Sequence, residues 1–184
     1  METLENYFLI ATPALNDTFW ADGVIYVCEH SKTEGSMGIM ISHPSSDVTF
    51  DEVAQELNLP EPRGDKPIIL TGGPVETNRG FVIHDDGYHH ESTVDLAPRI
   101  HLTATPEIVG KIAEGNAPKN LNFFLGYAGW DAGQLEEEIA ENSWLMLEAD
   151  PEILYNTPAT RRHQACLDKL GIDASRMSAI AGHA

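Results

Sequence analysis

Cysteine is scarce in this chain of 184 residues, which contains only Cys28 and Cys166. Small domains held together by disulfides carry several cysteines at short spacings, so a disulfide framework is excluded. Glu2 and Glu5 stand where a secretory signal would carry positive charge, and no apolar run is long enough to cross a bilayer. We therefore expect a cytoplasmic protein that does not contact a membrane.

Basic residues are also few. The chain has 11 Lys and Arg against 29 Asp and Glu, which gives a formal net charge of −18. A field of this sign repels the phosphate backbone of nucleic acids unless a local basic patch overrides it, and the largest basic cluster is the pair Arg161 and Arg162. Direct binding of nucleic acid is therefore disfavoured.

The apolar pattern predicts an α+β fold with a mixed sheet, and the length fits one domain spanning residues 1–184. Strands and helices are intermixed without a regular βαβ alternation, and two strand pairs look antiparallel. We expect strands at 7–11, 24–28, 38–41, 68–70, 80–84, 100–103, 121–127 and 144–147, and helices at 50–57, 106–113, 132–142 and 158–170. The polar stretch 84–95 is expected to be an exposed loop.

The stretch from Leu125 to Ile139 organises the chain around it. Its glycines permit a tight turn or a close approach of two backbones, and Trp130 between them is expected to be a buried anchor. Asp131, three residues before Gln134, is typical of a capping box that opens a helix. This stretch indicates how the fold is held together, and it contains no recognisable catalytic motif.

Cys28 and His30 are two residues apart on an expected strand, so their side chains would point to the same side. An adjacent imidazolium can lower the pKa of a thiol and produce a nucleophilic thiolate. The pair could instead bind a metal with further ligands such as His43 or His84, although no known ligand spacing is present. The third interpretation is a buried, inert thiol beside a histidine at the sheet edge.

A second candidate region begins with Gly72 and Gly73, followed by Arg79. Backbone N–H groups of such a turn, with a guanidinium nearby, could bind a small anion, or the glycines could simply form a hairpin turn. His84 opens a cluster with Asp85, Asp86, His89 and His90, which could take up a transition metal or be a solvated loop. No nucleotide-binding loop is present, and we predict no cofactor and no metal.

Several long motifs in order resemble the YqgE/AlgH family of bacterial proteins. The resemblance covers nearly the whole chain and rests on YFLIATPAL, VIYVCEHS, GSMGIMIS, GGPV, RGFVIH, LGYAGWDAGQLEEEI, NSWL, LGID and the terminal GHA. It implies a single cytosolic domain whose mixed, partly barrel-like antiparallel sheet is surrounded by helices. Members have no settled biochemical activity, and their frequent description as transcriptional regulators does not imply contact with DNA.

The chain departs from the usual family pattern at three places. Ser42 ends GIMIS where the usual form ends in Asn, Tyr155 and Asn156 replace a Phe and an Asp, and His163 stands where Trp is common. A family site that depends on that Asn or Asp is therefore in doubt here.

Together these observations predict a regulatory protein that is not an enzyme and acts by binding a protein partner or a small ligand. The alternative is an enzyme or redox sensor that uses Cys28 with His30. The predicted binding residues are Gly72, Gly73, Arg79 and His84.

Overall fold

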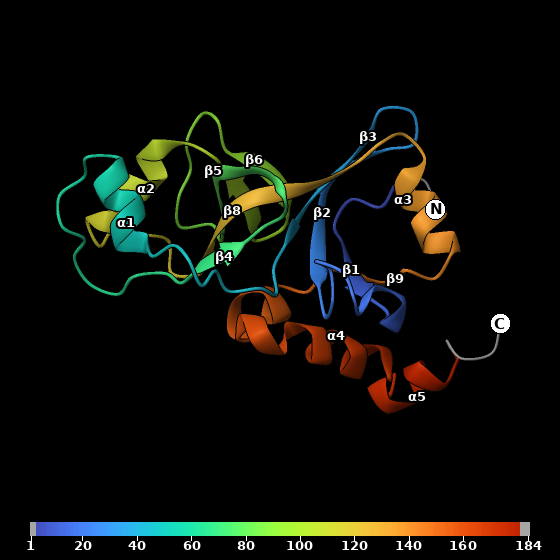
Figure 1. The fold of residues 1–184 in the computed structure, drawn as a ribbon. Coiled ribbons are helices and arrows are strands. Elements are labelled where there is room, and N and C mark those ends of the chain that lie inside the picture. The colour runs from blue at the N-terminus through green and yellow to red at the C-terminus, as the bar shows by residue number, and fades with distance from the viewer. Residues whose placement is uncertain (1–2, 181–184) are drawn as a thin grey trace. The chain divides into compact units, whose positions relative to one another are not determined.

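The structure is a computed structural model that describes residues 3–180, so the terminal GHA motif lies outside the described residues. Its strands are β1 (Tyr7–Ala11), β2 (Val24–Ser31), β3 (Gly35–Met40), β4 (Ile69–Thr71), β5 (Val75–His84), β6 (Val94–Ala97), β7 (Ile100–Thr103), β8 (Leu121–Trp130) and β9 (Trp144–Glu148). Its α-helices are α1 (Phe50–Glu56), α2 (Pro106–Ala113), α3 (Gln134–Ala140), α4 (Arg162–Leu170) and α5 (Ala174–Ile180) (Figure 1). Shorter helical turns are η1 (Pro13–Leu15), η2 (Glu152–Asn156) and η3 (Ala159–Arg161).

The chain divides into two compact units, which we call unit 1 and unit 2. Unit 1 contains residues 1–43 and 128–184, and unit 2 contains residues 44–127. Strand β8 is continuous across the boundary, so its last three residues belong to unit 1 and the rest to unit 2. Whether the chain behaves as one domain in solution stays a prediction.

Unit 1 is built on antiparallel strands in the order β8, β3, β2, β1, β9. Their β-branched and aromatic residues suit a sheet that is covered on both faces. The core includes Leu9, Val27, Trp130 and Leu135, and α4 packs against β1. Trp130 is 8% exposed, which confirms its predicted role as a buried anchor.

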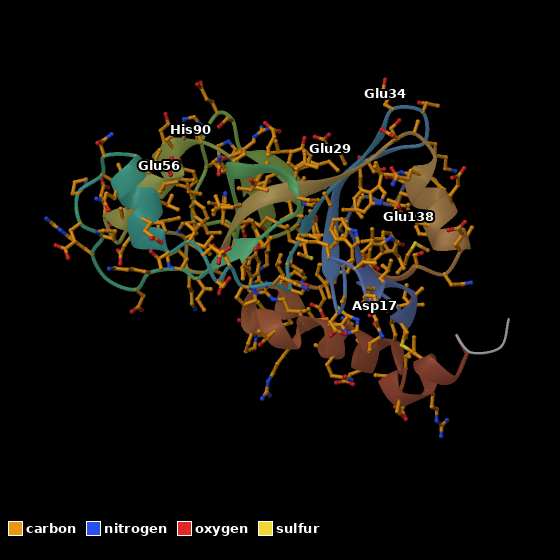
Figure 2. All side chains as sticks on the ribbon, in the orientation of Figure 1. Asp17, Glu29, Glu34, Glu56, His90 and Glu138 are labelled. Atoms are coloured by element: carbon orange, nitrogen blue, oxygen red, sulfur yellow. The ribbon has the colours of Figure 1, made fainter. Side chains whose placement is uncertain are left out.

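Glu138 joins helix α3 to the strands of unit 1. Its Oε2 accepts hydrogen bonds from the indole N–H of Trp130 at 2.9 Å and of Trp144 at 2.8 Å. Its Oε1 accepts from Gln134 Nε2 at 2.9 Å, and the side chain points from α3 toward the strands (Figure 2). A charged acceptor makes stronger hydrogen bonds than a neutral one, so one carboxylate fixes two buried tryptophans.

Unit 2 has antiparallel strands in the order β6, β7, β5, β8, and β4 pairs with β8 in parallel. Helices α1 and α2 pack on this sheet through an apolar core that includes Phe50, Val82, Ile108 and Phe123. Both helices show the 3.6-residue apolar pattern that covers one face of a sheet.

Eight of the nine described strands form one hydrogen-bonded order from β6 to β9, β4 pairs with β8 outside this order, and the two end strands β6 and β9 do not pair with each other. The sheet is therefore open, and the barrel-like closure that the resemblance implied is absent from the described strands. The α+β fold with a mixed, mainly antiparallel sheet is confirmed. Among the described residues, no helix is both long and apolar enough to pass through a bilayer.

Local signals predicted some element boundaries well. The capping box at Thr49 is present, because its backbone N–H donates to Glu52 Oε2 at 2.7 Å and its Oγ1 accepts from the Glu52 N–H at 3.4 Å. Helix α2 spans the predicted 106–113. The N-cap predicted at Asp131 is wrong: α3 begins at Gln134 after Gly133, whose φ of 79° already makes the turn. Only the Asp131 N–H bond to Gln134 Oε1 remains of that box.

The polar stretch predicted to be an exposed loop contains an unexpected strand. Residues Val94–Ala97 form β6, which pairs with β7 in the register Val94 to Leu102. Strand β5 likewise begins at Val75 rather than at the predicted residue 80. Pairing with a neighbouring strand overrides weak local propensity at both places.

Candidate functional site

The predicted site residues fall in both units, and each unit is described by itself. Cys28 and His30 lie on β2 in unit 1, whereas Gly72, Gly73, Arg79 and His84 lie in unit 2.

Cys28 is a core residue of unit 1. It is 5% exposed, and the register of β2 against β3 shifts between Val27 and Glu29, which places Cys28 at a bulge. Its Sγ lies 3.8 Å from the carbonyl oxygen of Tyr26. Burial, with a smaller contribution from the charge of Glu29, raises the pKa of the Cys28 thiol far above its usual range. This environment favours the inert-thiol interpretation over the thiolate interpretation.

His30 is engaged by acidic side chains rather than by the thiol. Its Nε2 lies 2.9 Å from Glu136 Oε1, and its backbone N–H donates to Glu5 Oε1 at 3.2 Å. Among the described residues, no hydrogen bond joins His30 to Cys28. Within residues 3–180 there is also no group of three His, Cys, Asp or Glu side chains placed to hold a metal ion.

Gly72 of the predicted anion-binding turn is needed where the chain after β4 approaches β8 closely. A Cβ atom on Gly72 would lie 2.2 Å from the carbonyl oxygen of Gly126, and one on Gly126 would lie 2.4 Å from that of Gly73. The N–H of Gly72 donates to the Leu125 carbonyl at 2.8 Å. That N–H is therefore occupied, which favours a structural role for Gly72.

His84 is fully buried at the end of β5 and lies in a chain of hydrogen bonds. Its Nδ1 is 2.8 Å from the carbonyl oxygen of Asp85, its Nε2 is 2.8 Å from Thr103 Oγ1, and that hydroxyl is 2.8 Å from Thr93 Oγ1. Because the carbonyl can only accept, Nδ1 carries the proton and Nε2 accepts from Thr103. Burial lowers the pKa of His84, so the ring stays neutral.

A neighbouring histidine has the opposite charge preference. His101 Nδ1 lies 2.7 Å from Asp95 Oδ1, and its Nε2 lies 2.7 Å from Asp86 Oδ1. Burial opposes protonation of His101, but the hydrogen bonds to both carboxylates prevail and raise its pKa. The sequence pattern places Asp86 in a candidate cluster but does not indicate that His101 joins it, because the two are 15 residues apart and Asp95 meets His101 only through the pairing of β6 with β7.

Arg79 is on β5 and remains partly in solvent, with 54% of its side chain exposed. Its Nη1 donates to Glu76 Oε2 at 3.3 Å, and its guanidinium carbon lies 5.0 Å from the centre of the Phe81 ring. Phe81 in turn contacts Tyr127 edge to face at 5.9 Å. The guanidinium is therefore oriented by an aromatic ring on one side and a carboxylate on another.

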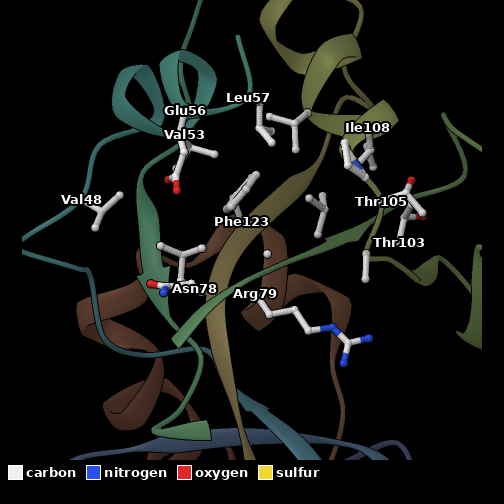
Figure 3. A pocket seen from close by; sticks show the side chains of 16 residues that line it. Val48, Val53, Glu56, Leu57, Asn78, Arg79, Thr103, Thr105, Ile108 and Phe123 are labelled. Atoms are coloured by element: carbon white, nitrogen blue, oxygen red, sulfur yellow. The ribbon is translucent and has the colours of Figure 1, made fainter. Parts of the chain in front are cut away.

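Arg79 borders a cavity of about 480 Å³ that lies wholly within unit 2. Figure 3 shows its lining, in which aliphatic and aromatic side chains surround the centre and a few polar groups lie around them. The apolar lining includes Val48, Val53, Leu57, Val82, Ile108, Val109, Phe123 and Leu125, and the polar lining comprises Glu56, Asn78, Arg79, Thr103 and Thr105.

One polar group of the lining has hydrogen-bonding capacity to spare. Thr105 Oγ1 is buried and makes no hydrogen bond of ordinary geometry among the described residues. Thr105 is the N-cap of α2 but gives no side-chain cap, and Pro106 follows at the first helical position. The backbone N–H of Glu107 lowers the pKa of the Glu107 carboxyl most, and the nearby Thr105 hydroxyl lowers it further.

Residues 8–175 match the family described as AlgH-like. The chain belongs to this family. It is 44% identical over 183 residues to a UPF0301 protein of Saccharophagus degradans, which covers 99% of this chain and 89% of that protein. It is 41% identical over 187 residues to a UPF0301 protein of Yersinia enterocolitica, with 98% and 99% covered.

Solved structures agree with this assignment. The solution structure of the AlgH protein from Pseudomonas aeruginosa has a TM-score of 0.81 and 40% identity, covering 99% of this chain and 96% of that one. A crystal structure of a protein from Corynebacterium diphtheriae has a TM-score of 0.73 at 21% identity, covers 97% and 93% of the two chains, and shows the fold alone. The resemblance to the YqgE/AlgH family is therefore confirmed.

Sequence reasoning identified one residue of the cavity in this AlgH-like chain, namely Arg79. The remaining lining comes from four separate segments around Val53, Arg79, Thr105 and Phe123. No local motif marks such a site, because it exists only after α1, α2, β5 and β8 have packed together.

Proposed function

We propose that this AlgH-like protein is a cytoplasmic regulatory protein that acts by binding a small ligand in the cavity of unit 2. The apolar lining of the cavity carries the proposal, and its volume of about 480 Å³ lies within the range of roughly 300 to 1,000 Å³ that ligand pockets usually have. Its lining is mainly apolar with a few polar groups, which is the usual composition of a site that binds an organic molecule and orients it.

A concave site supports a small ligand better than a protein partner. Five large apolar side chains are exposed among the described residues, and no two of them are neighbours in the sequence: Phe19, Leu57, Ile68, Val75 and Val94. Single exposed apolar residues are normal on a protein surface and do not indicate a docking face. Leu57 is the member of this set that lines the cavity.

Any regulation of transcription by this protein would be indirect. The net charge of −18 opposes contact with the DNA backbone. A ligand-dependent regulator of this kind would transmit its state to another molecule rather than occupy DNA itself.

Binding of a neutral aromatic probe tests the cavity. We expect naphthalene-2-carboxamide, added to the full chain labelled with ¹⁵N, to shift the amide resonances of Val53, Ile108 and Phe123. The variant Val53→Phe places a ring in the cavity and should abolish these shifts, because the added side chain occupies the ligand's volume.

The matched control is Val94→Phe, which makes the same substitution at a half-exposed position of unit 2 that does not line the cavity. This variant should bind the probe as the original chain does. Shifts confined to other residues, or shifts that persist in Val53→Phe, would contradict the proposal. A strain with Val53→Phe should also show the transcript changes of a deletion strain, whereas one with Val94→Phe should not.

A further inference from the structure

The chemical class of the ligand follows from the one cation in the lining of the cavity. We propose that the ligand is a monocarboxylate whose carboxylate binds the Nε–Nη2 edge of Arg79 and whose apolar body fills the cavity. This inference rests on the proposed ligand-binding function and adds a specific recognition group to it.

Charge selects the head group. Arg79 is the only Lys or Arg among the lining residues, in a chain with 11 basic and 29 acidic residues. A planar guanidinium matches a carboxylate with two parallel hydrogen bonds, which a Lys ammonium cannot do. An anion would otherwise be repelled by most of this protein's surface, so binding at this position requires that local cation.

The guanidinium already has a fixed orientation and an open edge. Phe81 lies against it at 5.0 Å, and Glu76 accepts from Nη1. Among the described residues, no hydrogen bond engages Nε or Nη2 of Arg79. Because the side chain is oriented before binding, less conformational entropy is lost when a carboxylate arrives.

The cavity has separate places for the carboxylate and for the apolar part of the ligand. Figure 3 shows the Arg79 guanidinium at the rim, extending away from Val53 and Leu57, while Phe123 lies near the centre. A ligand with its carboxylate at the rim keeps its charge partly hydrated and buries its apolar part against these side chains. Thr105, whose hydroxyl has hydrogen-bonding capacity to spare, lies farther along the same lining.

Two carboxylates of the protein limit what the ligand can carry. Glu56 also lines the cavity and lies on the other side of it from Arg79 in Figure 3. A second acid on the ligand would meet this like charge, which favours a single carboxylate. Glu76 shares Arg79 with the ligand, but both partners of that pair are about half exposed, so its contribution is small.

The direct test compares two probes that differ only in the head group, 2-naphthoate and naphthalene-2-carboxamide. Titration of the full chain by fluorescence and calorimetry should give an affinity for the carboxylate about tenfold above that for the amide. Arg79→Gln should remove this difference, because the affinity for the carboxylate falls by about tenfold to that for the amide. Glu76→Gln should tighten carboxylate binding, because a competing negative charge beside the guanidinium is lost.

Arg63→Gln is the matched control. Arg63 is an exposed arginine of unit 2 that does not line the cavity, so its loss changes the net charge equally and should leave the preference for carboxylate intact. The thermal midpoints of both arginine variants should match that of the original chain, since neither side chain is buried.

The possible outcomes separate this inference from the proposed function. If the amide binds as tightly as the carboxylate, the ligand class is wrong and the cavity still binds small molecules. If neither probe binds, the proposed function is wrong and this inference fails with it. Displacement of 2-naphthoate by millimolar inorganic phosphate would show a general oxyanion site and overturn the choice of a carboxylate.

Discussion

The two units of this AlgH-like protein use their polar side chains differently. In unit 1, Glu138 accepts from two indoles and Arg162 donates to two backbone carbonyls, so polar groups near the core are consumed by the fold. Around the cavity of unit 2, Arg79 keeps an open edge and the Thr105 hydroxyl stays without an ordinary hydrogen bond. A buried polar group without a hydrogen bond carries a free-energy cost, so the Thr105 hydroxyl is a place where a ligand or a water molecule could bind, whereas the open edge of Arg79 is solvated and available.

The largest expected loss of stability tests whether the polar groups of unit 1 stabilise the fold. Arg162 is 4% exposed, and it donates from Nη1 to the Ile41 carbonyl at 2.7 Å and from Nε to the Thr157 carbonyl at 3.0 Å. Burial lowers its pKa to about 10, so it remains charged near neutral pH. Arg162→Met should lower the free energy of unfolding in urea by about 3 kcal/mol, because charged hydrogen bonds are lost while the apolar stem is retained.

The neighbouring Arg161 is exposed and provides the control. Arg161→Met removes the same charge and should change the free energy of unfolding by no more than about 0.5 kcal/mol. Equal losses in the two variants would mean that net charge, rather than the buried hydrogen bonds, determines the effect.

Glu138→Ala should have the next largest effect, a loss of about 2 kcal/mol, because it leaves two indole N–H groups without their acceptor. The emission of Trp130 and Trp144 should change at the same time. The control is Glu137→Ala, which removes an equal charge from an exposed position on the same helix. Both variants relieve the same charge repulsion in this acidic chain, so the difference between their free energies of unfolding reports the lost hydrogen bonds. Unchanged stability and emission in Glu138→Ala would contradict a stabilising role for this carboxylate.

In unit 2, the hydrogen-bonded network of His84, Thr103 and Thr93 is also used by the fold, and the pH dependence of stability tests this. The folded-state pKa of His84 is lowered by burial, so below the unfolded pKa of about 6.5 the unfolded chain binds a proton that the folded chain does not. The contribution of His84 to stability should therefore fall as the pH drops from 7 to 5, and His84→Gln should make the loss of stability over this range smaller. Burial also lowers the pKa of His43, so part of the dependence of stability on pH should remain in His84→Gln.

The contribution of His101 to stability changes with pH in the direction opposite to that of His84. Despite burial, its hydrogen bonds to Asp86 and Asp95 raise its folded-state pKa, so its contribution is fully present below about pH 6.5 and is lost as the pH rises through the raised value. His101→Gln should therefore remove a gain in stability that develops as the pH falls from the raised pKa to about 6.5, and it should leave the slope below that pH nearly unchanged. Thermal denaturation from about pH 5 to 9 measures both slopes, and a change of the same sign in the two variants would contradict this assignment.

How far the sequence predicts the structure depends on the range of the interaction. Helix α2 could be predicted to the residue because Thr105, Pro106 and Gly115 act through neighbouring backbone. Strand β6 could not, because Val94 and Asp95 become a strand only by pairing with β7. The cap at Asp131 was wrong because Gly133, in a left-handed conformation, ends the turn first.

The candidate site follows the same rule. Arg79 could be named because an arginine after a glycine-rich turn is a local signal, whereas the cavity beside it depends on four segments that meet only in the fold. The spacing of Cys28 and His30 puts both side chains on one side only in a regular strand. The register shift between Val27 and Glu29 and the bond from His30 to Glu136 are tertiary features that no spacing rule contains.

The smallest expected effect concerns Cys28, and it tests whether unit 1 holds any reactive group. In a Cys166→Ser background, native Cys28 should react slowly with iodoacetamide from about pH 6 to 9, because burial at 5% exposure raises the pKa of its thiol. His30→Ala should leave that rate unchanged, since His30 pairs with Glu136 instead of the thiol. The same protein unfolded in urea supplies the rate of a free thiol. Fast native labelling that is lost in His30→Ala would establish an activated thiolate, and it would move the search for function from the cavity of unit 2 to an enzyme or redox sensor in unit 1.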